Sequence, residues 1–561
     1  MANFAKVYFV GRMIESFFGR SLVLLFSSFF AWGVWAQQVV VDKLVYQLDG
    51  AGEKATAQVV AGHYSGVVRI PERIQHEGRS YAVTGIAEEA FAHQHSVVEL
   101  HVPASVRYIG PRAFLHCNAL RTLRLEAPLV ELAEGVFQDC EGLTELQLPS
   151  TLRGLGKRCF AGCSSLRSLT LPEGVTALSE GAFAGCRALE HLPLPKGIRE
   201  LPANCFSLCR SLTSIELPEG VEEVGDSCFR ACEGLTELRL PRSLRRVGRE
   251  AFAACLELES VELPVGLSQL GERVWEDCSA LTSFRVAEGN AHFSTLDGVL
   301  CDASRRVLLK YPEARTGHYR IPDSIVRIGH GALAYSHSLS GLDIPEGVQH
   351  IEDDALLGCA LLERVLLPAS LRTLGRGALA HCAALTSIEV AAGNVNFAAR
   401  EGLLYDASLR TLLQFPAGRA GGCVLPESVE RIAARACYKA EGLRGMALPV
   451  GLRRIDDEAF AYCTELAQLS FPPALESIGS YAFFSCFNLP NFTLPATLKS
   501  LGASAFEACE NAHELRLLSP KAPQTLGAPF DPRRRVHILP AATGFDVAPW
   551  TDYEVLRDAT P

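Results

Sequence analysis

The stretch 217-LPEGVEEVGDSCFRACEGLTELRLP-241 begins and ends with the same Leu-Pro step, first at Leu217 and again at Leu240. Within it, residues 235–240 end in alternating apolar and polar side chains, which is typical of a short strand with one buried face. Pro241 ends the strand because its nitrogen carries no hydrogen for a strand ladder. Gly225 here, and Gly248 one unit later, are expected to allow a tight turn into the next segment. A single unit of this kind is too small to bury its own leucine and phenylalanine side chains.

The same unit recurs along most of the chain. When the units are aligned on the aromatic residue of the Ala-Phe step, sixteen copies place at this position Phe91, Phe114, Phe137, Phe160, Phe183, Phe206, Phe229, Phe252, Trp275, Leu333, Leu356, Leu379, Cys437, Phe460, Phe483 and Phe506. The spacing is constant except at two longer gaps of equal length, from Trp275 to Leu333 and from Leu379 to Cys437. A strict period in the twenties predicts a solenoid, in which stacked copies bury a continuous ladder of apolar side chains.

The unit reads Ala-Phe-x-x-Cys-x-x-Leu-x-x-Leu-x-Leu-Pro, followed by x-x-Leu-x-x-Ile-Gly. This line resembles the repeat of the BspA-like leucine-rich repeat proteins of bacterial surfaces. The resemblance covers nearly all of the chain after residue 36. It implies a leucine-rich-repeat solenoid whose 23-residue coils stack through a parallel β-sheet, with short helical or irregular turns on the other side. It also implies an extracellular or cell-surface protein, of a kind often linked to adhesion to host proteins or other cells.

The two gaps hold similar sequences, 289–312 and 393–416, which lie 104 residues apart. Each contains two β-like runs around an Asp-Ala-Ser turn, so each is expected to add a β-hairpin to the coil. Both look like a known variation of the resembled family. The expected organisation is a signal peptide at 1–36, an N-terminal cap at 37–82, the repeat array at 83–517 with insertions near 287–321 and 391–425, and a C-terminal cap at 518–561.

The first 36 residues are typical of a secretory signal. Arg12 and Arg20 precede an apolar stretch at 21–36 that is short for a membrane span, and small residues precede the expected cleavage after Ala36. A retained N-terminal anchor is the alternative, and Met13 is a second possible start. No other stretch of the sequence is apolar enough to span a membrane. The N-terminal cap is expected to contain a hairpin of 39–48 and 56–60.

Thirteen of the 19 cysteines occupy the third position after the aromatic: Cys117, Cys140, Cys163, Cys186, Cys209, Cys232, Cys255, Cys278, Cys359, Cys382, Cys463, Cys486 and Cys509. The other three copies have Gln94, Ser336 and Ala440 there. Free cysteine behaves as a small buried hydrophobe, so we interpret the series as a structural ladder of reduced thiols. Disulfides are the alternative, because the chain is expected to be exported. A zinc site is disfavoured by the spacing of one cysteine per coil.

The charge of the chain and its lack of catalytic motifs argue against nucleic-acid binding and against enzymatic activity. The net charge is −10 and no basic stripe occurs, which argues against nucleic acid as a partner. Nucleophile, metalloprotease and phosphate-binding motifs are absent from the sequence. The repeated acids of the insertions, Asp297, Asp302, Glu401 and Asp406, are better explained by hairpin turns than by acid–base catalysis. We therefore predict no enzymatic activity, cofactor or metal site.

The outward strand positions carry no aromatic residue in any copy, which disfavours stacking on sugars along that face. The insertions offer apolar anchors for a partner instead, some of which are expected to belong to the core: Phe293, Tyr311, Phe397, Tyr405 and Phe415. The predicted function is binding of a protein or another cell-surface macromolecule by an adhesin-like protein. A non-adhesive structural scaffold of the bacterial envelope is the alternative, and a hydrolase is disfavoured by the missing motifs.

Overall fold

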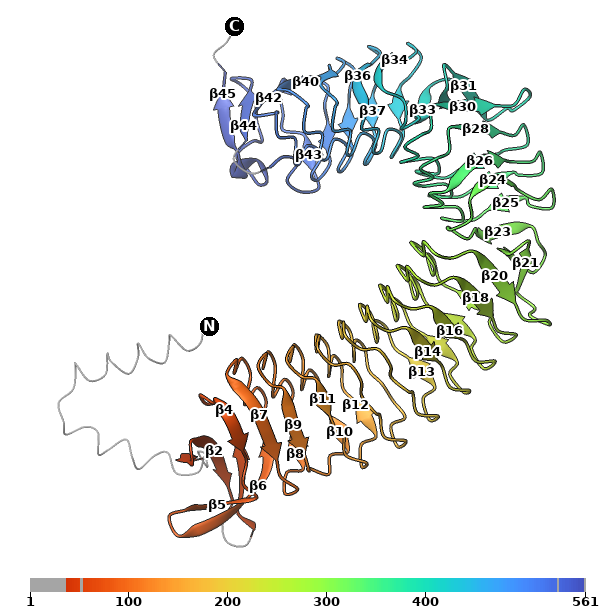
Figure 1. The fold of residues 1–561 in the computed structure, drawn as a ribbon. Helices are drawn as coiled ribbons and strands as arrows, with labels where there is room; N and C mark the ends of the chain where they lie inside the picture. Colours follow the sequence, from red (N-terminus) through yellow and green to blue (C-terminus); the bar gives the residue numbers. More distant parts are fainter. Residues whose placement is uncertain (1–36, 51–53, 532–533, 559–561) are drawn as a thin grey trace, which may run out of the picture.

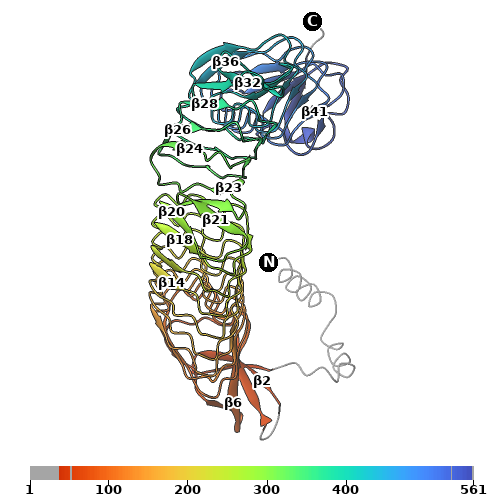
Figure 2. The ribbon, with the colours of Figure 1, turned by 90° about the vertical axis from the view of Figure 1, so that its right-hand side faces the viewer.

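The chain forms an open arc of stacked coils (Figure 1). Figure 2 shows the same arc turned by 90°, with its N-terminal and C-terminal parts seen from the side. The computed structural model describes residues 37–50, 54–531 and 534–558. The predicted signal peptide and its cleavage site lie outside the described residues. None of the helices in the described part combines the length and the apolar character needed to cross a membrane.

Most regular coils contribute two strands rather than the single strand expected from the sequence, although between residues 146 and 214 the first-strand positions form only the isolated bridge of Ser168 with His191. The first follows the Leu-x-Leu pattern and pairs in parallel with its counterparts in neighbouring coils. The first strands are β4 (Gly66–Arg69), β7 (Val97–Val102), β9 (Thr122–Leu125), β11 (Glu145–Leu146), β14 (Ser214–Glu216), β16 (Glu237–Arg239), β18 (Ser260–Leu263), β20 (Ser283–Val286), β24 (Gly317–Arg320), β26 (Leu339–Asp343), β28 (Arg364–Leu367), β30 (Ser387–Val390), β34 (Gly421–Val424), β36 (Leu443–Ala447), β38 (Gln468–Leu469), β40 (Phe492–Leu494), β42 (Glu514–Leu517) and β44 (Arg535–Ile538).

The second strand is the x-Ile or x-Leu step before the glycine of the repeat, and it also pairs in parallel from coil to coil. The second strands are β8 (Tyr108–Ile109), β10 (Glu131–Leu132), β12 (Gly154–Leu155), β13 (Glu200–Leu201), β15 (Glu223–Val224), β17 (Arg246–Val247), β19 (Gln269–Leu270), β25 (Arg327–Ile328), β27 (His350–Ile351), β29 (Thr373–Leu374), β35 (Arg431–Ile432), β37 (Arg454–Ile455), β39 (Ser477–Ile478), β41 (Ser500–Leu501) and β43 (Gln524–Thr525). These strands are too short for alternation to reveal them in the sequence.

The glycine after the second strand has a different role from the one expected. Gly225 and Gly248 do not adopt a positive φ. A Cβ atom on Gly225 would lie 2.7 Å from the backbone nitrogen of Ala203, and one on Gly248 would lie 2.6 Å from that of Asp226. Glycine is therefore required because the backbone of the preceding coil approaches closely, and not because the chain makes a left-handed turn.

The turns that carry the aromatic residues lie along the inner edge of the arc. Figure 1 shows this, since first strands such as β7 and β20 follow these turns, start at the inner edge and point outward. In all sixteen copies, the residues two before and two after the aromatic position have positive φ, as at Arg112 (53°) and His116 (56°). Three backbone N–H groups per turn donate to the next coil: Arg112 to Glu134 O, Phe114 to Val136 O and His116 to Gln138 O, at 2.8 to 3.0 Å. We call these groups the inner-edge donors. The turns are thus irregular rather than helical.

The phenylalanine ladder fills the core behind this edge. From Phe91 to Phe252, neighbouring rings lie 5.1 to 5.5 Å apart between centroids. Both caps add a ring to it: Tyr64 lies 4.6 Å from Phe91, and Phe530 lies 5.7 Å from Phe506. The caps therefore continue the core instead of merely covering it.

The N-terminal cap divides the expected strand 39–48 at Asp42, where φ is positive, into two antiparallel strands. The second of these pairs with the third, as the sequence predicted, and β4 joins β7 in the array. The remaining cap elements are β1 (Gln38–Val41), β2 (Leu44–Asp49), β3 (Thr56–Val59), β5 (Arg73–His76), β6 (Arg79–Ile86), the 3-10 helix η2 (Trp550–Asp552) and β45 (Glu554–Arg557).

Each insertion is a three-stranded antiparallel meander, one strand more than predicted. The strands are β21 (Phe293–Leu296), β22 (Val299–Asp302) and β23 (Val307–Lys310) in the first, and β31 (Phe397–Arg400), β32 (Leu403–Asp406) and β33 (Thr411–Gln414) in the second. The last strand of each meander pairs in parallel with the second strand of the following coil. We call the two insertions with the coils on either side the first joint and the second joint.

The joints divide the hydrophobic core into three large clusters of buried residues, and a small fourth cluster of Ala334, Leu357 and Ala380 lies in the middle stack. One runs from Val39 to Leu300, the next from Val299 to Leu404, and the last from Leu403 to Tyr553. Each boundary falls within a meander. The arc is therefore three stacks joined end to end by the insertions.

Candidate functional site: the first joint

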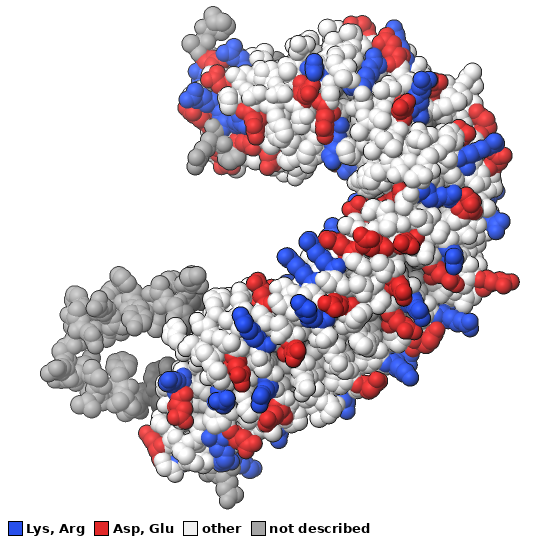
Figure 3. All heavy atoms as spheres, in the orientation of Figure 1, with Lys and Arg blue, Asp and Glu red and all other residues white. Residues whose placement is uncertain are grey.

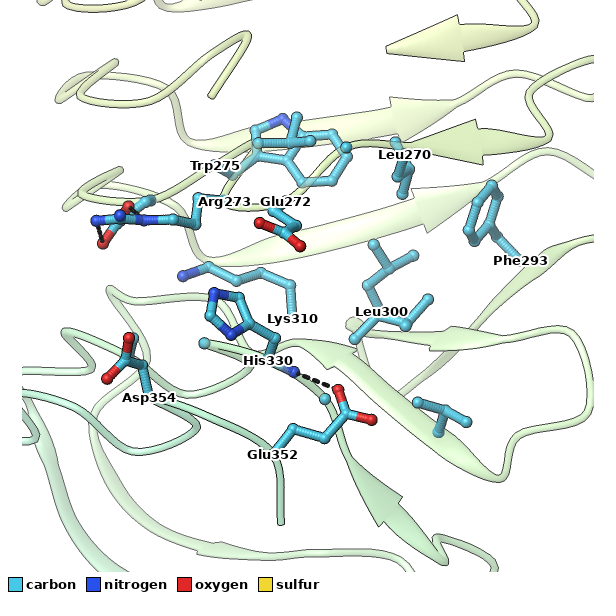
Figure 4. A pocket seen from close by; sticks show the side chains of 18 of the residues that line it. Leu270, Glu272, Arg273, Trp275, Phe293, Leu300, Lys310, His330, Glu352 and Asp354 are labelled. Carbon is cyan, nitrogen blue, oxygen red and sulfur yellow. Dashed lines mark hydrogen bonds and ion pairs between the residues drawn. The ribbon is translucent and has the colours of Figure 1, made fainter. Parts of the chain in front are cut away.

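A cavity of about 780 Å³ lies at the first joint (Figure 4). Residues 268–276, which include the end of β19, form one wall. The meander strands β21 to β23 and the start of the next coil, residues 327–334, form the other. No pattern in the sequence indicated this cavity, because it arises where two coils fail to stack directly.

The cavity borders an interrupted ladder. β19 is the last strand of the sheet β13-β15-β17-β19, and the next sheet of second strands begins with the meander strand β21. One coil earlier, the carbonyl of Val247 accepts a hydrogen bond from Gly271 N at 2.8 Å. The corresponding carbonyl of Leu270 has no backbone partner among the described residues, and neither do the inner-edge donors Arg273 N and Trp275 N. The joint thus presents the unpaired end of the first stack.

The third inner-edge donor at this joint, Asp277 N, donates to a side chain instead of to a backbone carbonyl. Asp277 N donates to Oε1 of Glu313 at 3.1 Å, so a carboxylate replaces the carbonyl that a directly stacked coil would provide. Lys310 Nζ lies 2.6 Å from the same oxygen, and both side chains are buried. Burial raises the pKa of Glu313, although Lys310 and the hydrogen bonds oppose this effect. The Glu313 carboxylate, held by Lys310, therefore links the first stack to the segment that follows the meander through its hydrogen bond from Asp277 N.

The other charged groups of the cavity differ in whether they have partners. Arg327 pairs with Glu352 at 3.0 Å, and Glu352 also accepts from the backbone N–H of His330 (Figure 4). Glu272 is exposed and forms no ion pair with any described residue. Figure 4 places Leu270, Phe293 and Leu300 together at one end of the cavity. The cavity therefore combines an apolar end with one unpaired carboxylate.

The second joint is spanned by an arginine. Arg435 lies 3.0 Å from Asp354 on the preceding stack and 2.8 Å from Glu458 on its own. Gly377 leaves space for this ion pair, since a Cβ there would lie 2.7 Å from Asp354 Oδ1 and 3.1 Å from Arg435 Cδ. The residue of the first joint that corresponds to Arg435, 104 positions earlier, is Gly331, which has no side chain to span the cavity.

The predicted partner anchors are mostly core residues. Tyr311, Tyr405 and Phe415 are no more than 2% exposed, so these three belong to the core, as was expected of some of the five anchors. Tyr311 N donates to Ala332 O and Phe415 N to Ala436 O, both at 2.7 Å, which are the bonds made by the aromatic of a regular coil. Each meander therefore ends in an additional coil whose aromatic is Tyr311 or Phe415. Phe293 and Phe397 are half-buried, and Phe293 lines the cavity.

The thirteen cysteines of the predicted ladder are buried, and each makes the same contact. Sγ donates at 3.0 to 3.4 Å to the carbonyl of the aromatic-position residue in the preceding coil, as in Cys209 to Phe183 O. Burial raises the pKa of most of these thiols, that of Cys186 to about 12. All 19 cysteines of the chain are free thiols in the structure.

The copies without this cysteine are those that follow a cap or an insertion. Gln94 is in the first copy, and its amide bonds the cap through Gly62 O and Tyr64 N at 2.9 and 3.0 Å. Ser336 and Ala440 follow the first and second meanders, and the buried hydroxyl of Ser336 has no partner among the described residues. The substitutions therefore mark places where the preceding coil is irregular.

The repeated acids of the insertions lie at turns, as predicted from the sequence, and two of them, Asp302 and Asp406, stabilise their turns through side-chain hydrogen bonds. Asp302 Oδ1 accepts from the backbone N–H groups of Arg306 and Val307 at 2.7 and 2.8 Å, and Asp406 accepts from the matching groups in the second meander. Burial alone would raise the pKa of Asp302, but hydrogen bonds from Ser304 and from these backbone groups lower it. Asp297 lies at the turn between β21 and β22, 2.6 Å from Arg315.

A group of aromatic side chains on the inner edge of the last stack was missed from the sequence. Tyr438 and Tyr462 lie 5.6 Å apart, and Tyr462 and Phe484 lie 5.4 Å apart, between ring centroids. Lys439 lies over the rings of both tyrosines. The lack of aromatic residues holds for the outward strand positions, whereas these side chains project from the turns.

The repeat pattern of the BspA type leucine rich repeat region, with six copies, matches residues 84–212, 199–295, 314–412 and 423–522. Among solved structures, the chain is similar to a leucine-rich repeat protein from Bacteroides ovatus, with 23% identity, 82% of this chain and 95% of that chain covered, and a TM-score of 0.43. A leucine rich cell surface protein from Faecalibacterium prausnitzii has 19% identity, covers 86% of this chain and 94% of its own, and has a TM-score of 0.37.

The leucine-rich repeat protein of T. pallidum is 26% identical over 40% of this chain and 91% of its own, with a TM-score of 0.29. No curated protein sequence matches the chain. The residues matched by the repeat pattern make up most of the chain, and the stacked coils show the same repeat in space. The chain therefore belongs to the BspA type leucine-rich repeat family, whose members are commonly bacterial surface proteins.

Proposed function

We propose that this protein is exported to the bacterial surface, with cleavage after Ala36, and binds macromolecules there in the manner of an adhesin that contacts host matrix proteins or other cells. The observation that carries the proposal is the long array of stacked coils, which presents a broad surface along the whole arc (Figure 1). Extended solenoids use such surfaces to bind other macromolecules. The membership of a family of surface proteins supports the location.

The surface chemistry favours a protein partner over a polyanion. Lys and Arg are interspersed with Asp and Glu over the face seen in Figure 3, without a stripe of one sign. Many are paired across neighbouring coils, as in Lys157 with Glu180 and Arg453 with Glu476. A nucleic acid would require clustered basic residues that are free to neutralise phosphates. The proposal includes no catalytic activity, cofactor or metal.

Protease shaving of intact producing cells tests the location. Peptides of this chain, identified by mass spectrometry, should be released without lysis, together with those of a known surface protein and without those of a periplasmic marker. Release only after the outer membrane is broken would contradict surface display. That result would favour a structural scaffold of the envelope.

Binding of the purified chain to immobilised host matrix proteins tests the activity. We expect saturable binding to at least one of them that is partly lost at high salt, because an interface of mixed charge is partly screened by ions. A chain truncated to the first stack is a comparison for avidity. Lack of saturable binding to any matrix protein or host cell would contradict the adhesin function.

A further inference from the structure

We propose that the cavity at the first joint is a docking site for an extended peptide segment of a partner protein, which adds to β19 as the missing strand. The inference deepens the proposed binding function by stating that the partner binds through an extended peptide segment. It rests on the proposed function only for the claim that such binding occurs at the bacterial surface. The docking itself is a property of the purified chain.

The first argument is the set of unpaired backbone groups. In a regular coil the next coil satisfies the carbonyls of the second strand and the inner-edge donors. Along 268–275 the carbonyls of Ser268 and Leu270 and the N–H groups of Arg273 and Trp275 have no backbone partner among the described residues. Such groups are costly when left unpaired and are the features that extended peptides recognise on a sheet edge. A backbone in the extended conformation supplies donors for the carbonyls and acceptors for the N–H groups.

The second argument is the space and its lining. The cavity of about 780 Å³ is wide enough for several residues and continues directly from β19. Leu270, Phe293 and Leu300 form an apolar end (Figure 4). Side chains of an extended peptide alternate between two faces, so one apolar side chain can enter this end while its neighbours face solvent.

The third argument is charge. Lys310 is engaged by Glu313, and Arg327 is engaged by Glu352, whereas Glu272 has no ion-pair partner among the described residues. An acidic peptide would meet this free carboxylate without a free cation to compensate. The geometry therefore favours a segment with an apolar side chain for the Leu270 end and a lysine or arginine for Glu272.

The second joint shows how the space can be filled from within the chain. There Arg435 spans the joint, with a φ of 58°. Its counterpart Gly331 has a φ of 57°, and a Cβ there would meet only the Cβ of Ala334, at 3.9 Å. The carboxylates that correspond to the two partners of Arg435 are present at the first joint as Glu250 and Asp354. Glu250 also pairs with Arg230 and Arg249, and Asp354 also pairs with Arg435. The substitution Gly331→Arg is thus expected to fold and to occupy the docking site.

The test is a selection of random twelve-residue peptides on the purified chain, followed by affinity measurements with the enriched peptides. We expect enriched peptides that alternate apolar and polar residues and include a lysine or arginine. Their binding should fall at least tenfold in Gly331→Arg and be retained in Gly181→Arg. Gly181 holds the same turn position in a regular coil, with a φ of 64°, so that variant controls for the added charge and side chain.

Two further measurements separate docking from an indirect effect. Peptide binding should slow hydrogen exchange at the backbone amides of Arg273 and Trp275, and Glu272→Gln should weaken the basic peptides selectively. Enrichment of no peptide, or equal binding to the Gly331→Arg variant, would overturn the proposal. A concentration-dependent dimer that Gly331→Arg abolishes would also overturn it in favour of a second copy as the occupant. All these readouts use purified protein, so they remain informative if the protein proves not to be displayed on the surface.

Discussion

The cysteine of each coil acts through one hydrogen bond repeated along the stack. The thiol of Cys209 donates to Phe183 O at 3.2 Å, and the same carbonyl accepts the backbone N–H of Cys186. Cys209→Ala removes this second donor and leaves a small void. We expect the free energy of unfolding to fall by about 1 kcal/mol. Urea denaturation followed by circular dichroism would measure the change.

Cys423→Ala is the matched control, because Cys423 is half-buried and lies outside the ladder. Its replacement should alter the free energy of unfolding by less than about 0.5 kcal/mol. Equal losses for the two variants would show that burial of the thiol, and not its place in the ladder, sets the effect.

The same burial predicts the reactivity of the thiols. Because burial raises the pKa of most of them, little thiolate forms at mildly alkaline pH, and the folded chain should resist iodoacetamide. Cys423, whose pKa is raised only to about 11, should react first as the pH rises. Mass spectrometry should find all 19 cysteines labelled once the chain is unfolded in guanidinium without reductant. Fewer labels would demonstrate disulfides in the exported protein.

The sequence predicted which cysteines form the ladder but not why three copies lack it. Gln94 bonds the cap, and Ser336 and Ala440 follow meanders, so each exception depends on the neighbouring coil rather than on its own. The prediction that the glycine of each coil is a turn residue was wrong for a similar reason. Its requirement comes from the backbone of the coil before it, which a single repeat does not reveal.

At the scale of elements, the two joints differ in the side chains at and just after the end of the last strand of each meander. The first has the buried pair Lys310 and Glu313, and the second has Gln414 and Ala417 at the same places. Glu313→Ala would leave Lys310 buried without a partner, and we expect it to destabilise the joint by about 3–5 kcal/mol. Thermal unfolding and limited proteolysis at residues 277–313 would measure the loss.

The double variant Lys310→Gln, Glu313→Ala copies the second joint and supplies the control. It removes both charges and provides the amide that bonds Phe415 O and Ala436 O in the second joint. Its stability should lie within about 1 kcal/mol of that of the original chain, since replacing both members of a buried pair is far less costly than removing one. A double variant as unstable as Glu313→Ala would contradict this account of the joint.

The regular period of the sequence was sufficient to predict the stacked coils, the first strands and the positions of both insertions. It concealed the coils of Tyr311 and Phe415, because each lies off the regular interval from the preceding copy and lacks the downstream cysteine. For this reason both side chains are among the predicted partner anchors, although both belong to the core. The cavity could not be predicted at all, since it arises where two coils fail to stack directly, and Gly331 lines it at the place where the second joint has Arg435.

At the scale of the whole molecule, the division of the core predicts stepwise unfolding. Buried residues form three large clusters whose boundaries lie within the meanders, and a solenoid is stabilised by contacts between neighbouring coils. The middle cluster has leucine at its three regular aromatic places, Leu333, Leu356 and Leu379, and so buries less apolar area per coil than the phenylalanine stacks. It should therefore be the least stable of the three.

Hydrogen exchange in increasing urea should accordingly resolve three groups of amides, at 39–300, 299–404 and 403–553, with the middle group opening first. Coils inside one stack, such as those of Phe137 and Phe183, are the internal control and should exchange at a common free energy because their rings stack without interruption. One common free energy of opening for all three groups would contradict this prediction. It would mean that the meanders couple the folding of neighbouring stacks as strongly as direct contact couples neighbouring coils. Separate values would mean that the arc can bend or open at its joints while each stack remains folded, and would place the peptide site proposed above on one of those boundaries.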